Sequence, residues 1–214
     1  DLTLSESVAG LLGFPPQELE GPLAEHVAAF AAARNETPAQ ARKELLAWYD
    51  GYRFSPDSDV KVCNPISLIK ALREKELYNH WETTGYASLI IERIKASNDI
   101  PADLNGIVAS RIELDVCDAA SMPTTALLYQ AGYLTIRDVL EPGFFELGIP
   151  NKEVDDSLHR GFISTLFPDF RTFTMLNRAA MDVRRNGPVK FIKQIIHTAF
   201  ATIPYEWKIE NEAQ

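Results

Sequence analysis

The side chains able to do acid–base, nucleophilic or metal chemistry are spread widely along this sequence. Ser121 and Ser164 lack the sharp glycine-flanked turn that exposes a nucleophilic serine. The four histidines form no HxH or HxxxH pair of the kind that tight metal sites usually contain: His26, His80, His159 and His197. We therefore predict no catalytic residue and no metal ligand in this chain.

Carboxylates occur close together at two places, Asp155-Asp156 and Asp115 with Asp118. Adjacent acids near a helix start are explained by the positive end of the helix, without any catalytic role. A metal-dependent nuclease would need an Asp and a Glu-x-Lys arrangement on paired strands. Glu74-Lys75-Glu76 lies at an expected helix end, so it does not supply that arrangement.

Phosphate binding needs glycines and the free amides at a helix start, and this sequence has neither a GxxxxGK[ST] loop nor a GxGxxG turn. We predict no cofactor-binding residue here and no ATPase activity of this chain alone.

Four aromatic residues surround an Asp-Gly turn in WYDGYRF, residues 48–54. Such side chains can stack on bases or ligands, but aromatics beside a helix end more often pack into the core under the next loop. Arg53 is the exception, since a guanidinium held by packed aromatics can reach a phosphate or a carboxylate. We expect Arg53 to be a contact between domains or with a phosphate.

Positive charge collects near the C-terminus, where residues 157–200 contain seven basic and two acidic residues. Such a stretch can bind nucleic acid, although solvated helix faces often carry scattered basic residues. The candidate nucleic-acid-binding residues are Arg171, Arg178, Arg184, Arg185, Lys190 and Lys193.

Composition bounds the remaining possibilities. With 214 residues, 46% hydrophobic and 24% charged, the chain can fold around a core, and its net charge of −9 argues against a surface that is basic all over. No apolar run approaches the roughly 20 residues that cross a bilayer, and no secretory start is present. We expect a cytoplasmic protein without a membrane partner, in which Cys63 and Cys117 are reduced thiols.

Helices dominate the first part of the chain. Pro15-Pro16 starts a helix that carries Leu19 and Phe30, and Thr37-Pro38 with Gln40 makes a capping box for the next one. Asn64-Pro65 repeats the cap-then-proline pattern. We predict a helical, lid-like region over residues 1–98.

The second part, residues 99–214, contains the strand signals. Ile107–Ala109 and Ile112–Val116 alternate as one or two short strands, and Pro142-Gly143 joins the two strands of a hairpin. A helix over Pro123–Ala131 precedes the hairpin, and Asn151 caps a helix that follows it. We expect a mainly α fold: a helical bundle, then a winged-helix-like unit with one β-hairpin and trailing helices.

That helix–hairpin–helix unit resembles DNA-binding modules in outline only. In such modules the helix before the wing carries basic and amide side chains into the major groove. Here the helix over Pro123–Ala131 has no Lys or Arg, and its only polar reader is Gln130. The charge pattern favours a protein-facing or intramolecular role.

Several segments together resemble one protein family. LLAWYDGYRF, NPISLIKAL, the W-x-x-TG turn at Trp81–Gly85, LLYQAGYLTI and LGIPNKEV are similar to segments of bacterial AAA-ATPase-like proteins with a C-terminal PD-(D/E)XK nuclease-type domain. The similarity runs in order from LLGF at Leu11 to IPYE at Ile203, nearly the whole chain.

The resemblance implies that this chain is the segment between an N-terminal nucleotide-binding core and the nuclease-like domain. ATP and Mg²⁺ would then bind elsewhere in a longer protein, and the family's catalytic residues have no matching positions here. The expected function is regulatory or structural, with the other domains of the same polypeptide as partners. The alternative is a nucleic-acid-binding module that uses the stretch from Arg171 to Lys193; a self-contained hydrolase is the third and least favoured reading.

Overall fold

A computed structural model describes residues 9–81, 90, 93, 104–116, 122–166, 174 and 178 of this chain, with side chains of the last long helix described as far as residue 161. The chain divides into two compact units, Asp1–Leu158 and His159–Gln214, and nearly all described residues belong to the first.

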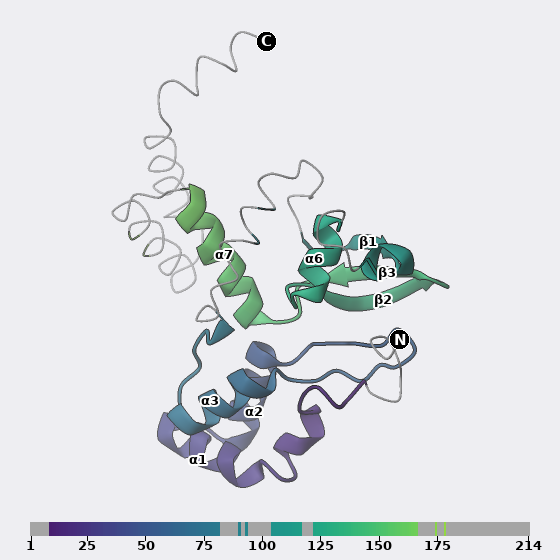
Figure 1. The fold of residues 1–214 in the computed structure, drawn as a ribbon. Coiled ribbons are helices and arrows are strands. Elements are labelled where there is room, and N and C mark those ends of the chain that lie inside the picture. Colours follow the sequence, from purple (N-terminus) through teal and green to yellow (C-terminus); the bar gives the residue numbers. More distant parts are fainter. Residues whose placement is uncertain are drawn as a thin grey trace, which may run out of the picture. The chain divides into compact units, whose positions relative to one another are not determined.

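Three helices pack against one another in the first part of the chain (Figure 1): α1 (Ala24–Arg34), α2 (Pro38–Tyr49) and α3 (Pro65–Glu74). The helix expected from Pro15-Pro16 is in fact two elements, a 3-10 helix η2 (Pro16–Leu19) and then α1. Their shared core is built from hydrophobic residues, which include Leu19, Phe30, Leu45, Tyr49, Cys63, Leu68 and Leu72. Cys63 is free and buried, and Cys117 lies outside the described residues.

The predicted caps hold these helices as expected. The Thr37 hydroxyl accepts a hydrogen bond from the Gln40 amide at 3.3 Å, and the Gln40 side chain accepts one from the Thr37 amide at 2.9 Å. Before α3, Asn64 Oδ1 accepts from the amides of Ile66 and Ser67. Each cap satisfies amides that have no partner inside the helix, which fixes where the helix begins.

A three-stranded antiparallel sheet forms the centre of the second part, in the order β1–β3–β2. Its strands are β1 (Ile107–Ser110), β2 (Thr135–Glu141) and β3 (Phe144–Gly148). In Figure 1 the helix α6 (Thr124–Gln130) lies beside this sheet, and α7 (Lys152–Leu166) follows β3. The Asn151 side chain caps α7 as predicted, through the Val154 amide at 3.1 Å.

The prediction of a mainly α fold with one hairpin is wrong, because β1 joins the hairpin and makes an α+β fold. Of the one or two short strands expected over Ile107–Val116, β1 forms, whereas Arg111–Leu114 is the short helix α5 and not a strand. A capping box explains the difference: the Ser110 hydroxyl accepts from the Glu113 amide, and the Glu113 carboxylate accepts from the Ser110 amide at 2.7 Å. Hydrogen bonds from the Ser110 amide and hydroxyl to the Glu113 carboxylate lower the pKa of Glu113 below its usual value.

The boundary predicted near Asn98 lies outside the described residues. Within the part that the structure describes, no helix is long and apolar enough to cross a membrane.

Candidate functional site

Residues 49–81 and residues 130–157 meet along a set of buried contacts that we call the junction. Gly51 begins it, with φ of +112°. A Cβ atom at this position would collide with the carbonyl oxygen of Pro150, so the two backbones touch only because residue 51 is glycine.

Arg53 forms the second contact of the junction. The Thr135 hydroxyl accepts a hydrogen bond from the Arg53 amide at 2.8 Å and donates one to the Arg53 carbonyl at 3.1 Å. The guanidinium contacts its own loop, where it donates to the carbonyl oxygens of Ser55, Pro56 and Ser58 and pairs with Asp59 at 3.2 Å. The structure therefore places the Arg53 backbone at the junction, while its charged group braces the loop after α2.

Asn79 makes the densest set of polar contacts at the junction. Its amide nitrogen donates to the Glu153 carbonyl at 3.2 Å, the Ser157 hydroxyl at 2.9 Å and the Asp156 carboxylate at 3.2 Å. The Ser157 hydroxyl donates back to Asn79 Oδ1 at 3.1 Å. Because Asn79 and Ser157 are buried, losing either partner would leave polar atoms without hydrogen bonds.

Glu153, in the first turn of α7, is fully buried. Its Oε1 atom accepts hydrogen bonds from the backbone amides of His80 at 2.8 Å and Trp81 at 3.1 Å. The other oxygen, Oε2, accepts none from the residues that the structure describes. The carboxyl thus binds the chain just beyond α3 through its main chain.

Burial raises the pKa of Glu153 to about 7, because removal from water disfavours the charged carboxylate. The Ser67 hydroxyl and the two backbone amides oppose this rise, as does the positive charge of Lys70. Glu153 therefore changes its charge near neutral pH. Burial also lowers the pKa of the neighbouring His80, so that this imidazole is neutral where Glu153 ionises.

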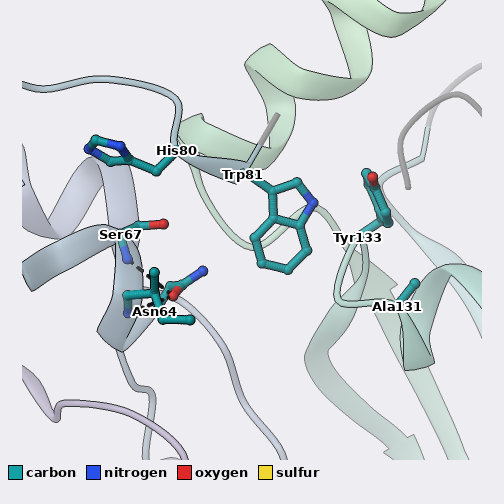
Figure 2. Close-up of a pocket in the computed structure, with 7 residues that line it drawn as sticks. Asn64, Ser67, His80, Trp81, Ala131 and Tyr133 are labelled. Carbon is teal, nitrogen blue, oxygen red and sulfur yellow. Dashed lines mark hydrogen bonds between the residues drawn. The ribbon is translucent and has the colours of Figure 1, made fainter. Parts of the chain in front are cut away.

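A pocket of about 370 Å³ opens beside Glu153. Most of its surface is apolar, and its lining residues are Asn64, Ile66, Ser67, His80, Trp81, Ala131 and Tyr133. Figure 2 shows the Trp81 indole between the start of α3 on one side and Tyr133 with Ala131 on the other. Ile66 is 66% exposed because it faces this open space and not the helical core.

Two aromatic rings form a right-angled corner of the pocket. The Trp81 and Tyr133 rings are 5.9 Å apart between centroids, at 88° to each other. Tyr52 stacks on Trp81 at 6.2 Å, and Gly132 lets the backbone pass close to the indole, since a Cβ there would lie 2.9 Å from Trp81 Cη2. The buried Tyr49 and Tyr52 agree with the packing interpretation of the WYDGYRF segment.

The predicted nucleic-acid residues are almost all beyond the described part of the chain. Arg178 is helical and exposed. The others lie outside the described residues: Arg171, Arg184, Arg185, Lys190 and Lys193. Of the described histidines, His26 and His159 are exposed and His80 lines the pocket, whereas His197 lies outside the described residues. Within the described residues no three metal-binding side chains come together.

Sequence reasoning missed Glu153, Trp81 and Tyr133 as parts of one site. Trp81 and Glu153 are 72 positions apart, and no pattern in the sequence connects them. One feature of the sequence pointed to this site. Three segments resemble the family and had no assigned role: W-x-x-TG, GYLTI and IPNKEV. The structure brings residues from all three segments to the junction.

The chain is similar to one protein of Azotobacter chroococcum mcd 1, described as an uncharacterized protein in the vnfD 5' region. The two are 25% identical over 214 residues, an alignment that covers 99% of this chain and 39% of that protein. The chain thus spans well under half the length of the relative it matches. No family model matches the chain, and no solved structure matches it.

Proposed function

We propose that this chain is a non-catalytic coupling segment of an AAA-ATPase-like protein, which transmits the state of a nucleotide-binding core to a nuclease-like domain. ATP and Mg²⁺ bind in this proposal to other residues of a longer cytoplasmic polypeptide. Its partners are the other domains of that polypeptide. The resemblance of the family-like segments and the coverage of 39% of the relative support the existence of such additional residues.

The observation that carries the proposal is the junction. Hydrogen bonds from Arg53, Asn79, His80 and Trp81 connect the helical part to β2 and α7 at positions 72 to 82 residues apart in the sequence. Buried, directional bonds of this kind make two elements move together, because sliding one past the other breaks several bonds at once. A segment built to transmit displacement needs this kind of stiff connection.

The proposal is tested first on nucleotide binding. Calorimetric titration of the 214-residue chain with MgATP should give no heat of binding. Binding in the micromolar range would contradict the assignment of nucleotide binding to other residues.

The coupling itself is tested in the longer protein. Asn79→Ala removes the polar contacts of Asn79 with α7 and should weaken the dependence of the downstream activity on ATP, while ATP binding stays unchanged. Lys43→Ala, at an exposed position of α2, is the matched control. Equal coupling in the Asn79 variant and the control would overturn the proposal.

A further inference from the structure

The geometry points to a binding site for a small organic cation, such as a methylated ammonium group, in the pocket lined by Trp81 and Ile66. This site belongs to the 214-residue chain itself and does not depend on the coupling function. The volume of about 370 Å³ is in the range of pockets that enclose small molecules.

The aromatic corner supplies the first attraction. An organic cation is attracted to the negative face of an aromatic ring, and tryptophan gives the strongest such contact. Trp81 is partly exposed in this pocket, whereas Tyr133 is 1% exposed and packs against the indole at 88°, so the indole is the ring that a cation can contact. Ile66 and Ala131 complete an apolar wall suited to methyl groups.

The second attraction is the buried carboxyl of Glu153. Glu153 does not itself line the pocket, but its Oε1 atom binds the backbone amides of His80 and Trp81, two lining residues. Within the described residues Glu153 forms no ion pair, and its polar contacts are the amides of His80 and Trp81 and the hydroxyl of Ser67. Above its pKa of about 7 Glu153 is a buried negative charge, which is unfavourable without a counter-ion, so a ligand that brings a positive charge nearby is stabilised.

Charges of both signs lie near the pocket. Among the described residues the lining includes no Lys or Arg, and burial lowers the pKa of the lining residue His80, which favours its neutral form. The positive charge of Lys70 on α3 lowers the pKa of Glu153, and the charges of Lys70 and Arg73 lower that of His80, whereas Glu74 raises the pKa of His80. The start of α3 carries partial positive charge, but Asn64 already caps the Ile66 and Ser67 amides, so these donors are not available to an anion.

Choline and its neutral isostere 3,3-dimethylbutan-1-ol are suitable probes, since they share a shape and differ in charge. Titrated into the 214-residue chain and followed by the indole N–H signal of Trp81 in ¹H–¹⁵N spectra, choline should bind at least about tenfold more tightly than the alcohol. Trp81→Leu should weaken the binding of choline at least about tenfold, measured calorimetrically.

Glu153→Gln isolates the contribution of charge, because the amide oxygen of glutamine still accepts from His80 and Trp81. This variant should keep its fold and lose the preference for choline over the alcohol. Glu25→Gln, which removes an exposed carboxylate on α1, should leave that preference unchanged. The anion 3,3-dimethylbutanoate, of similar shape, serves as a third probe. The inference is overturned if the wild-type chain binds neither choline nor the alcohol, binds both equally, or prefers the alcohol or the anion. It is also overturned if the Glu153→Gln substitution leaves the preference for choline intact.

Discussion

At the scale of single residues, Glu153 is the group with the largest influence on the junction. It is fully buried, its pKa is about 7, and it holds two backbone amides that belong to a distant part of the chain. A carboxyl in this position makes the free energy of unfolding depend on pH in a range where other carboxyls do not titrate.

Stability should therefore fall as the pH rises from about 4.5 to about 7. The folded protein binds the Glu153 proton more tightly than the unfolded chain, so the stabilisation is complete below the unfolded pKa and is lost as the pH passes the folded value. The loss should be roughly 3 kcal/mol, because each unit of difference between the folded and unfolded pKa corresponds to about 1.4 kcal/mol. Urea unfolding at several pH values measures it, and the curve of Glu153→Gln should lack this component; identical curves for both proteins would contradict the burial of a titrating carboxyl.

Substitution of Gly51 gives a second prediction at this scale, on the stability of the fold. Gly51→Ala should destabilise the protein by more than about 1 kcal/mol, because the new methyl group meets the Pro150 carbonyl and φ is +112°. Gly106→Ala is the matched control, since φ there is +79° with no atom within 4 Å of the added Cβ. Thermal unfolding should show a larger loss for the Gly51 variant, and equal losses would mean that backbone strain alone accounts for both.

At the scale of elements, the polar residues at helix starts were the features of the sequence that predicted the positions of helices best. Thr37, Asn64 and Asn151 cap helices as expected, because caps are local interactions that a short stretch of sequence specifies. The same rule, not applied at Ser110 and Glu113, would have identified α5 in place of a second strand. The pairing of β1 with β3, and the pocket beside Glu153, depend on contacts between distant residues and could not be obtained this way.

The capping box of α2 gives a test at this scale. Thr37→Ala should cost about 1 kcal/mol of unfolding free energy, because the Gln40 amide loses its acceptor at the helix start. Thr37→Ser keeps the hydroxyl and should cost much less. Chemical denaturation distinguishes the two, and an equal loss in both variants would show that the methyl group of Thr37, not its hydroxyl, matters.

At the scale of the whole molecule, the coupling proposal and the nucleic-acid alternative differ in the role they give to the positive charge near the C-terminus. The coupling proposal predicts weak binding of DNA that is the same for wild type and for a variant with Arg184, Arg185 and Lys193 all changed to Glu. Filter retention at low and at physiological salt measures this. Tight retention of the wild type that falls steeply with salt and disappears in the variant would favour the nucleic-acid alternative.

The hydrogen bonds to Glu153 are donated by the main chain at positions 80 and 81. They therefore restrict the amino acid at position 153 more strongly than the amino acids at positions 80 and 81. Position 80 can accept any amino acid that keeps its N–H, so only proline is barred by this bond. Position 153 tolerates few amino acids, since its side chain must place one oxygen within hydrogen-bond distance of both amides. Related sequences would then drift freely at one end of the bond while glutamate or glutamine persists at the other.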